Sequence, residues 1–174
     1  MGSIQIRRLT VEDATLLQQI GRTTFAQTFS SNNSKENMEK YLEEGFSLTK
    51  LQAEIDDPNA EFYFAMQDNS IIGYLKLNIG QSQTEIKNDN ALEIERIYVL
   101  KEFHGQNIGQ RLFEKALERA NAQKVDFIWL GVWEENRRAI QFYTKNGFVA
   151  FDKHIFKLGD EEQTDIMMKL KLIE

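Results

Sequence analysis

The spacing of apolar residues changes several times along the chain, and each change predicts a helix or a strand. Ile4 and Ile6 alternate with polar neighbours, which is typical of a short strand with one buried face. Apolar residues then recur at helical spacing in three successive segments. The N-caps of these helices are expected at Thr10, Ser34 and Ser47. Pro58, the only proline, ends the third helix, so this part of the chain is predicted to be one strand and three helices.

From residue 61 onwards the apolar residues mostly alternate with a period of two, which is typical of strands. Two helical segments interrupt this pattern, and Gly147 suits the left-handed position that ends the second of them. The expected elements are strands at 62–66, 71–79 and 92–99, a helix at 108–120, a strand at 125–132, a helix at 135–146 and strands at 148–157 and 164–172. This order predicts an α/β (α+β) fold with one mixed, mostly antiparallel sheet of about seven strands and helices on both faces.

Length and composition are those of a protein with its own core. The 174 residues, of which 41% are hydrophobic, are expected to form one domain spanning residues 1–174. The lack of cysteine excludes disulfides, thiolate metal sites and thiol nucleophiles. His104 and His154 are the only histidines and stand far apart, so no metal site is expected.

The charge balance limits the classes of partner. With 21 basic and 27 acidic residues the net charge is −6, which argues against a surface for nucleic acid or anionic lipid. No apolar run is long enough to span a membrane, and the first residues lack the apolar core of a signal peptide. We therefore expect a cytoplasmic protein without nucleic-acid or membrane partners, and the sequence leaves a homodimer open.

A glycine-containing loop joins the strand expected at 92–99 to the helix that follows it. Gly105, Asn107 and Gly109 accept the positive φ angles that a tight turn needs. The amides of such a loop and of the helix N-terminus converge on an anion, most naturally a phosphate. A turn that merely connects strand and helix fits the loop equally well. It is not a Walker loop, because no Gly-Lys-Ser/Thr follows.

The helix expected at 135–146 carries polar residues along one stripe. Asn136, Ile140 and Tyr143 lie at i, i+4 and i+7 and therefore share a face. An amide and a phenol beside an apolar residue suit the wall of a cleft. The alternative is that Tyr143 is a core aromatic residue whose hydroxyl reaches the surface.

Together the two segments resemble the acetyl-CoA-dependent N-acetyltransferase superfamily known as GNAT. The phosphate loop of that superfamily reads Gln/Arg-x-x-Gly-x-Gly/Ala; this chain matches it at Gly109 and departs from it at His104 and Asn107. The second motif matches throughout, with the residues Asn136, Ala139, Phe142, Tyr143, Gly147 and Phe148. The runs 34–38, 92–98, 128–134 and 159–165 are further similar to the PaiA subfamily, which is associated with acetylation of spermidine and spermine.

The resemblance implies that two neighbouring central strands splay apart and that acetyl-CoA lies along the exposed edge of one of them. Backbone groups of that strand are expected to bind the pantetheine arm, and the amides of the glycine loop the pyrophosphate. The implied cofactor-binding residues are Ile97, Tyr98, Val99, Gly105, Gln106, Asn107, Ile108, Gly109, Gln110, Asn136 and Tyr143. Asn136 is expected to orient the pantetheine, and Tyr143 to return a proton to the departing CoA thiolate.

An attacking amine must lose a proton, and two glutamates are candidates for accepting it. Glu95 stands where a related polyamine acetyltransferase carries its proposed base, and Glu93 shares its strand face by alternation. For either residue the alternative is an exposed or ion-paired strand carboxylate. The catalytic residues expected from the sequence are therefore Tyr143 and Glu95, with Glu93 as the second choice for the base.

The distribution of acidic residues fits a cationic acceptor. Residues 35–57 hold seven acidic residues against three lysines, and the runs 134–135 and 160–162 are entirely acidic. Each cluster alone is typical of a solvated surface. Together they favour direct transfer, through a ternary complex, to a primary amine of a polyamine or diamine. Two alternatives stay open: acetylation of a protein or another small amine, and an acetyl-CoA-binding regulator with little catalysis.

Overall fold

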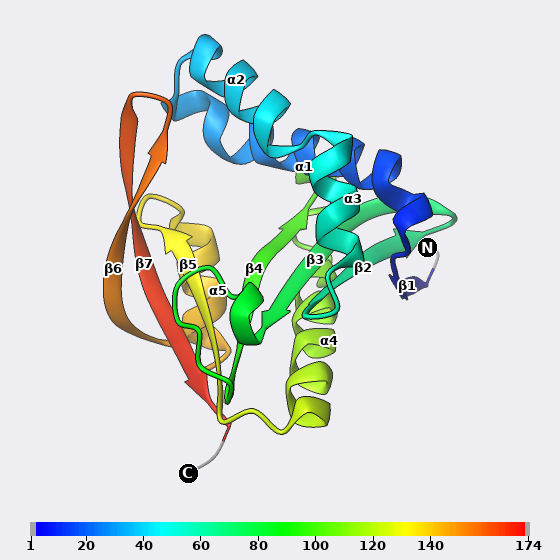
Figure 1. Cartoon of the computed structure of the whole chain (residues 1–174), viewed down its shortest axis with the longest axis vertical. Coiled ribbons are helices and arrows are strands. Elements are labelled where there is room, and N and C mark those ends of the chain that lie inside the picture. Colours follow the sequence, from blue (N-terminus) through cyan, green and yellow to red (C-terminus); the bar gives the residue numbers. More distant parts are fainter. Residues whose placement is uncertain (1–2, 173–174) are drawn as a thin grey trace.

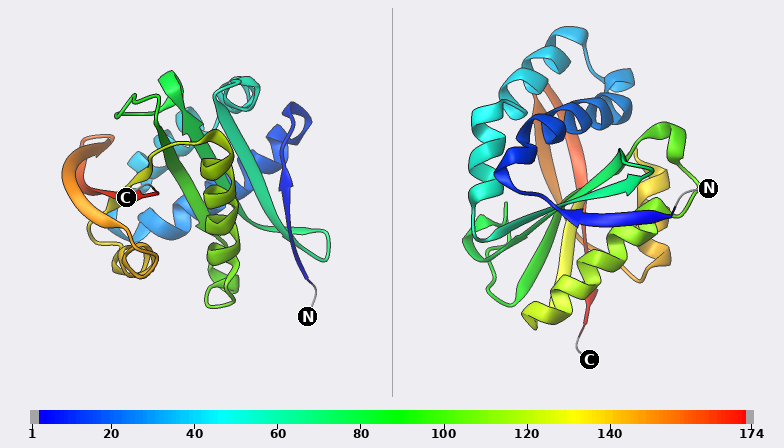
Figure 2. Two further views of the ribbon diagram at one scale, coloured as in Figure 1. Left: turned by 90° about the horizontal axis from the view of Figure 1, so that it is seen from below. Right: turned by 90° about the vertical axis from the view of Figure 1, so that its right-hand side faces the viewer.

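The computed structural model describes residues 3–172, which form a seven-stranded sheet with helices on both of its faces (Figure 1). The strands are β1 (Ile4–Arg8), β2 (Ala60–Gln67), β3 (Ser70–Ile79), β4 (Ala91–Val99), β5 (Phe127–Trp133), β6 (Val149–Leu158) and β7 (Glu161–Lys171). The α-helices are α1 (Ala14–Phe29), α2 (Lys35–Gly45), α3 (Leu48–Asp56), α4 (Ile108–Gln123) and α5 (Arg137–Lys145). The strand order is β1-β2-β3-β4-β5-β7-β6, which places β1 and β6 at opposite edges (Figure 2). The predicted fold class and order of elements are confirmed.

Local capping signals place the N-terminal helices. Ser34 accepts a hydrogen bond from the backbone N–H of Asn37 at 3.1 Å, and Ser47 accepts one from that of Lys50 at 3.3 Å, as expected of N-caps. Thr10 acts differently. It precedes a 3-10 turn (Val11–Asp13), and α1 begins only at Ala14.

Several other boundaries differ from the predicted ones by one to three residues, and the starts of β5, α5 and β7 have clear local causes. β5 begins at Phe127 rather than at 125, because Lys124 ends α4 in the left-handed conformation at φ 58°. α5 begins at Arg137 rather than at 135, because Asn136 is its N-cap. β7 begins at Glu161 rather than at 164, because β6 and β7 stay paired up to the turn between Leu158 and Glu161.

The two central strands pair only at one end and then separate. The parallel pairing of β4 with β5 covers three residues of β4, from Ala91 to Glu93, and Figure 1 shows the strands diverging beyond them. On its other side β4 pairs with β3, and the register shifts there so that Glu95 is an extra residue on β4. Such a bulge bends the strand that carries it. The splay implied by the family resemblance is therefore present and coincides with a bulge at Glu95.

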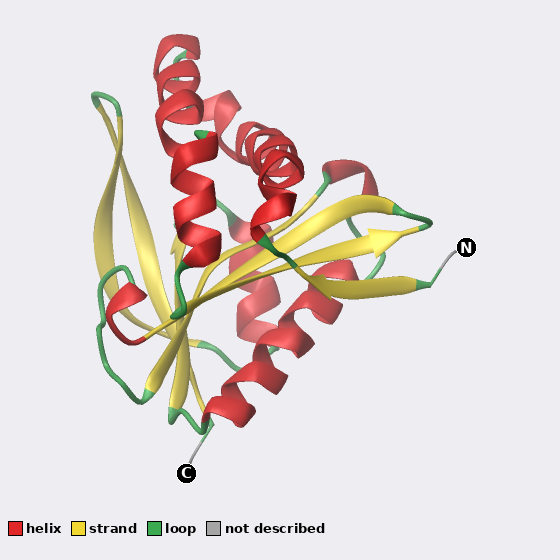
Figure 3. Ribbon diagram, turned by 45° about the vertical axis from the view of Figure 1, so that its right-hand side comes forward, coloured by secondary structure: helices red, strands yellow, loops and turns green. Residues whose placement is uncertain are grey.

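Separate cores hold the helices on the two faces (Figure 3). On one face Leu17 of α1 and Leu51 of α3 belong to a core with Phe64 of β2. On the other face Leu112 of α4 belongs to a core with Ile128 of β5 and with residues of α5. No helix within residues 3–172 is both long enough and apolar enough to cross a membrane. The open end of the β4–β5 pair thus lies between two helical layers.

Candidate active site

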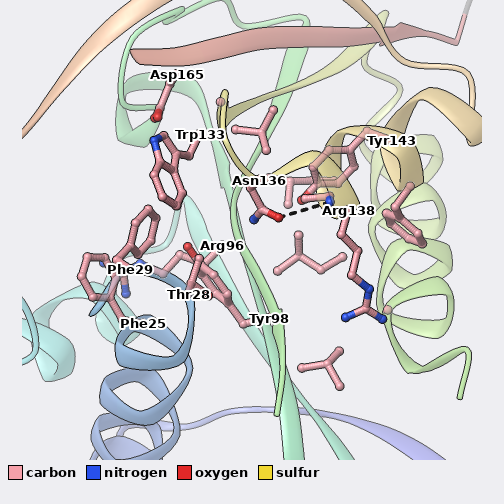
Figure 4. A pocket seen from close by; sticks show the side chains of 18 of the residues that line it. Phe25, Thr28, Phe29, Arg96, Tyr98, Trp133, Asn136, Arg138, Tyr143 and Asp165 are labelled. Atoms are coloured by element: carbon pink, nitrogen blue, oxygen red, sulfur yellow. Dashed lines mark hydrogen bonds between the residues drawn. The ribbon is translucent and has the colours of Figure 1, made fainter. Parts of the chain in front are cut away.

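A cavity of about 1090 Å³ opens where β4 and β5 separate (Figure 4). Residues of β4, β5 and β7 line it, together with residues of α1, α4 and α5. Figure 4 shows Asn136, Arg138 and Tyr143 on one side of β4 and the aromatic side chains Phe29 and Trp133 on the other. The splayed strands thus connect two chemically different ends of one cavity.

The free edge of β4 faces this cavity. Leu100 N donates to Ile72 O of the neighbouring chain segment at 2.8 Å, so the backbone groups of Leu100 point toward β3. Because backbone groups alternate sides along a strand, those of Ile97 and Val99 point to the open edge. The backbone groups of Tyr98 point to β3 instead, which corrects the expectation that all three residues offer backbone groups to a cofactor. Tyr98 contributes its side chain to the cavity lining.

One of the edge carbonyls already has a partner. His104 Nε2 lies 2.9 Å from Val99 O, and burial lowers the pKa of His104, so the neutral ring can donate this hydrogen bond. The departure from the superfamily's loop pattern at His104 therefore places an imidazole at the strand edge.

The glycine loop folds as the sequence predicts at two of its three positions, and Gly109 lies within α4 without a positive φ angle. Gly105 and Asn107 adopt positive φ angles of 83° and 63°, and α4 begins directly afterwards. The first helical hydrogen bond runs from Arg111 N to Asn107 O at 3.1 Å, so the preceding amides of the first turn have no partner within the helix. Gly109 and Gln110 of this turn line the cavity. A helix N-terminus with unpaired amides suits an anion.

Basic side chains that were not singled out from the sequence surround the same end of the cavity, at the N-terminus of α4. Lys101, Arg138 and Lys145 line the cavity together with the loop, and Figure 4 shows Arg138 on the α5 side. Their charges add to that of the helix N-terminus. No sequence motif marks them, because Lys101 follows β4 whereas Arg138 and Lys145 come from α5.

Asn136 and Tyr143 stand on one helix, as the predicted stripe requires. Asn136 Oδ1 accepts a hydrogen bond from Ala139 N at 3.3 Å, the dashed bond in Figure 4, which leaves the amide nitrogen for other partners. Tyr143 is only 7% exposed, and its ring lies 5.7 Å from that of Phe148. Tyr143 therefore belongs to the core and lines the cavity at once. Burial raises the pKa of Tyr143 well above its usual range, so the phenol keeps its proton at neutral pH.

Glu95 is half-buried within a network of charged groups. Its carboxylate accepts from Lys76 Nζ at 2.7 Å and from Asn78 Nδ2 at 2.8 Å, and Arg96 lies 3.5 Å away. Although burial opposes the charge, Arg96 and Lys76 together lower the pKa of Glu95 to about 2. The ion-paired strand carboxylate considered from the sequence is thus observed, and a carboxylate of this pKa is a weak base.

Glu93 is held by neutral donors instead. Thr84 donates from its backbone at 2.8 Å and from its hydroxyl at 2.6 Å, and Asn78 Nδ2 donates at 3.0 Å. Burial outweighs these bonds and raises the pKa of Glu93. Both glutamates line the cavity.

A third carboxylate, Asp165 of β7, lines the same cavity and was missed as an individual site by the sequence analysis. It stands opposite Trp133 of β5, and its Oδ2 would lie 3.6 Å from a Cβ at Gly131. Burial raises the pKa of Asp165 to about 6, although His154 lowers it. His154 Nδ1 itself lies 2.7 Å from Glu85 Oε1. Asp165 therefore changes its charge near pH 6.

Aromatic rings form the wall of the cavity at this end. The rings of Phe29 and Trp133 lie 5.4 Å apart, and Phe25 stacks on Tyr41 at 4.4 Å (Figure 4). The ring of Phe156 on β6 lies 6.0 Å from the ring of Tyr41. Aromatic faces beside carboxylates suit an aliphatic chain that carries positive charge. Within residues 3–172, no group of three or more acidic, histidine or cysteine side chains is arranged to hold a metal ion.

A splayed parallel strand pair beside a helix N-terminus with unpaired amides is the arrangement that the family resemblance implies for an acetyltransferase. Residues 24–148 match the family described as "Acetyltransferase (GNAT) family", and the chain belongs to this family. The resemblance read from the sequence is thereby confirmed.

Related proteins agree with this assignment along nearly the whole chain. An uncharacterized N-acetyltransferase of Lactobacillus delbrueckii subsp. lactis is 41% identical, over 99% of this chain and 100% of its own. The spermidine N(1)-acetyltransferase of Thermoplasma acidophilum is 29% identical, over 97% of this chain and 98% of its own. The crystal structure of a PaiA N-acetyltransferase from Thermoplasma acidophilum, in complex with coenzyme A, superposes with a TM-score of 0.80 at 28% identity and covers 97% of this chain and 99% of its own.

Proposed function

We propose that the protein transfers the acetyl group of acetyl-CoA directly to a primary amine of a linear polyamine or diamine. The observation that carries the proposal is that one cavity joins an end that suits phosphates to an end that is aromatic and acidic. The similarity to a spermidine N(1)-acetyltransferase supports the choice of acceptor.

The basic end of the cavity fits the donor. The unpaired amides of the first turn of α4, with Lys101, Arg138 and Lys145, would hold its phosphates. The edge groups of Ile97, the N–H of Val99 and the amide nitrogen of Asn136 would bind the pantetheine amides, while the Val99 carbonyl stays with His104. When bound, acetyl-CoA supplies an activated acetyl thioester.

Tyr143 is suited to the role of general acid. Its phenol is protonated at neutral pH, because burial raises its pKa, and it lines the cavity beside the open strand edge. As the carbon–nitrogen bond of the acetamide forms and the carbon–sulfur bond breaks, the sulfur needs a proton, which Tyr143 can donate.

Three of the cavity's carboxylates are candidates for the proton of the amine: Glu95, Asp165 and the second choice from the sequence, Glu93, whose pKa burial raises. Glu95 as the base stays a prediction, favoured by its place at the β4 bulge but opposed by its pKa of about 2. Asp165, with a pKa of about 6, has the greater proton affinity. We therefore place Asp165 beside Glu95 as a candidate base.

The pH dependence of activity distinguishes Asp165 from Glu95 as the base. If Asp165 must be ionised, kcat/KM rises with pH through about 6 in the wild type and in Glu95→Gln, and Asp165→Asn loses this step. If Glu95 is the base, it is ionised throughout that range and gives no step near pH 6, so Glu95→Gln loses activity at every pH while Asp165→Asn keeps the wild-type profile. Rates between pH 5 and 9 decide between these results, with thermal unfolding as a check that both variants fold.

A panel of acceptors tests the proposed reaction. We expect CoA thiol release from acetyl-CoA to be stimulated by spermidine, spermine and short diamines over a blank without amine. Transfer to a peptide N-terminus, a lysine peptide or an aminoglycoside in place of these amines would overturn the choice of acceptor. Binding of acetyl-CoA without turnover on any acceptor would instead support the regulator.

A further inference from the structure

A second, smaller cavity of about 270 Å³ adjoins the outer end of the first. Trp133, Asn32 and Glu135 line both cavities, so the aromatic wall of the first leads into the second. Residues from three segments meet there: the end of the turn that follows α1, the turn between β5 and α5, and the start of β7.

All the charged side chains that line this outer cavity are acidic. Glu134, Glu135, Glu161 and Glu162 line it, and none of its lining residues is basic. Glu161 accepts hydrogen bonds from Ser34 N at 2.9 Å and Asn37 Nδ2 at 2.8 Å, which lower its pKa and keep it ionised. The acidic pairs 134–135 and 161–162, which are far apart in the sequence, thus border a common space.

Gln163 provides an observation that is independent of the acidic residues. It is 8% exposed, it lines the outer cavity, and its Oε1 has no hydrogen-bond partner among the described residues. A buried acceptor without a partner is costly. A ligand rich in N–H donors, such as an ammonium group, would relieve that cost, whereas an anion would add to it.

A row of polar side chains along β7 connects the two cavities. Asp165 lines the first, Gln163 and Glu161 line the second, and alternate residues of a strand point to the same face. At about 3.4 Å per residue, Asp165 and Glu161 stand roughly 14 Å apart along the strand. Figure 4 shows Asp165 beside Trp133, which lines both cavities.

We infer that the outer cavity is a subsite for the distal ammonium group of a linear polyamine, and this inference rests on the proposed function. The amine at one end of the acceptor lies at the splayed strands, its methylene chain passes Trp133, and the far ammonium binds among Glu134, Glu162 and Gln163. The subsite thus selects acceptors by the distance between their charges.

The experiment compares spermine, which carries distal ammonium groups, with butylamine, which carries none. The quantity compared is kcat/KM for spermine divided by kcat/KM for butylamine. In the double variant Glu134→Gln/Glu162→Gln, we expect this ratio to fall about tenfold, because the KM for spermine rises. Added salt should reduce the preference for spermine in the wild type more than in the variant. The matched control is Glu114→Gln/Glu118→Gln on α4, where exposed charges lie on another element.

Several results would overturn the subsite. It is wrong if the ratio is the same in the wild type and in the Glu134/Glu162 variant, or if the α4 control lowers the ratio equally. A fall caused by kcat rather than KM would also contradict it. The failure of the proposed function looks different, because the wild-type protein would then acetylate neither amine.

Discussion

Replacing Tyr143 by phenylalanine is expected to lower turnover by about 10²–10⁴-fold, the range for one general acid. The variant removes only the hydroxyl, and its ring keeps the contacts with Phe142 and Phe148. Because burial holds the phenol in its protonated form, the missing group is a proton donor rather than a charge. Affinity for CoA should change little.

The measurement is single-turnover CoA release with saturating acetyl-CoA and spermidine, beside calorimetry with CoA. Tyr98→Phe is the matched control, because Tyr98 also lines the cavity and loses the same atom. We expect this control to stay within a few-fold of wild type. Wild-type turnover in Tyr143→Phe would reassign Tyr143 to packing, the alternative that its burial also allows.

The sequence predicts the elements well because their signals are local. Ser34 and Ser47 cap their helices within three residues, and the positive φ of Gly105 and Asn107 follows from residue type. The stripe that joins Asn136 and Tyr143 needs only the helical period. These features depend on neighbours in the chain and not on the arrangement of the sheet.

The electrostatics of the site depend on long-range register and could not be predicted. Glu95 is a weak base because the bulge and the β3–β4 pairing bring Lys76 to it. The residues next to Glu95 in the sequence do not indicate that partner. Asp165 reaches the cavity only because β7 lies beside β5. The direction of the Tyr98 backbone likewise follows from the pairing of β4 with β3.

Placing a carboxylate at Gly109 is expected to abolish most of the binding of CoA. Gly109 is in the first turn of α4 and lines the cavity, where the helix amides are unpaired. A Cβ there would lie 3.8 Å from Phe142, an ordinary contact, so a side chain can be accommodated. A negative charge about 5 Å from a phosphate at an effective dielectric constant of ~20 costs roughly 3 kcal/mol, or about 10²-fold in Kd.

Gly109→Gln is the matched control, because it adds nearly the same volume without the charge. Calorimetry should give a Kd for CoA about 10²-fold weaker in Gly109→Glu than in Gly109→Gln, and raised salt should narrow the gap, because it screens the repulsion. Equal weakening in both variants would mean that bulk alone blocks this turn. Unchanged binding in Gly109→Glu would move the phosphates away from the N-terminus of α4 and leave Lys101, Arg138 and Lys145 as their remaining partners on this cavity.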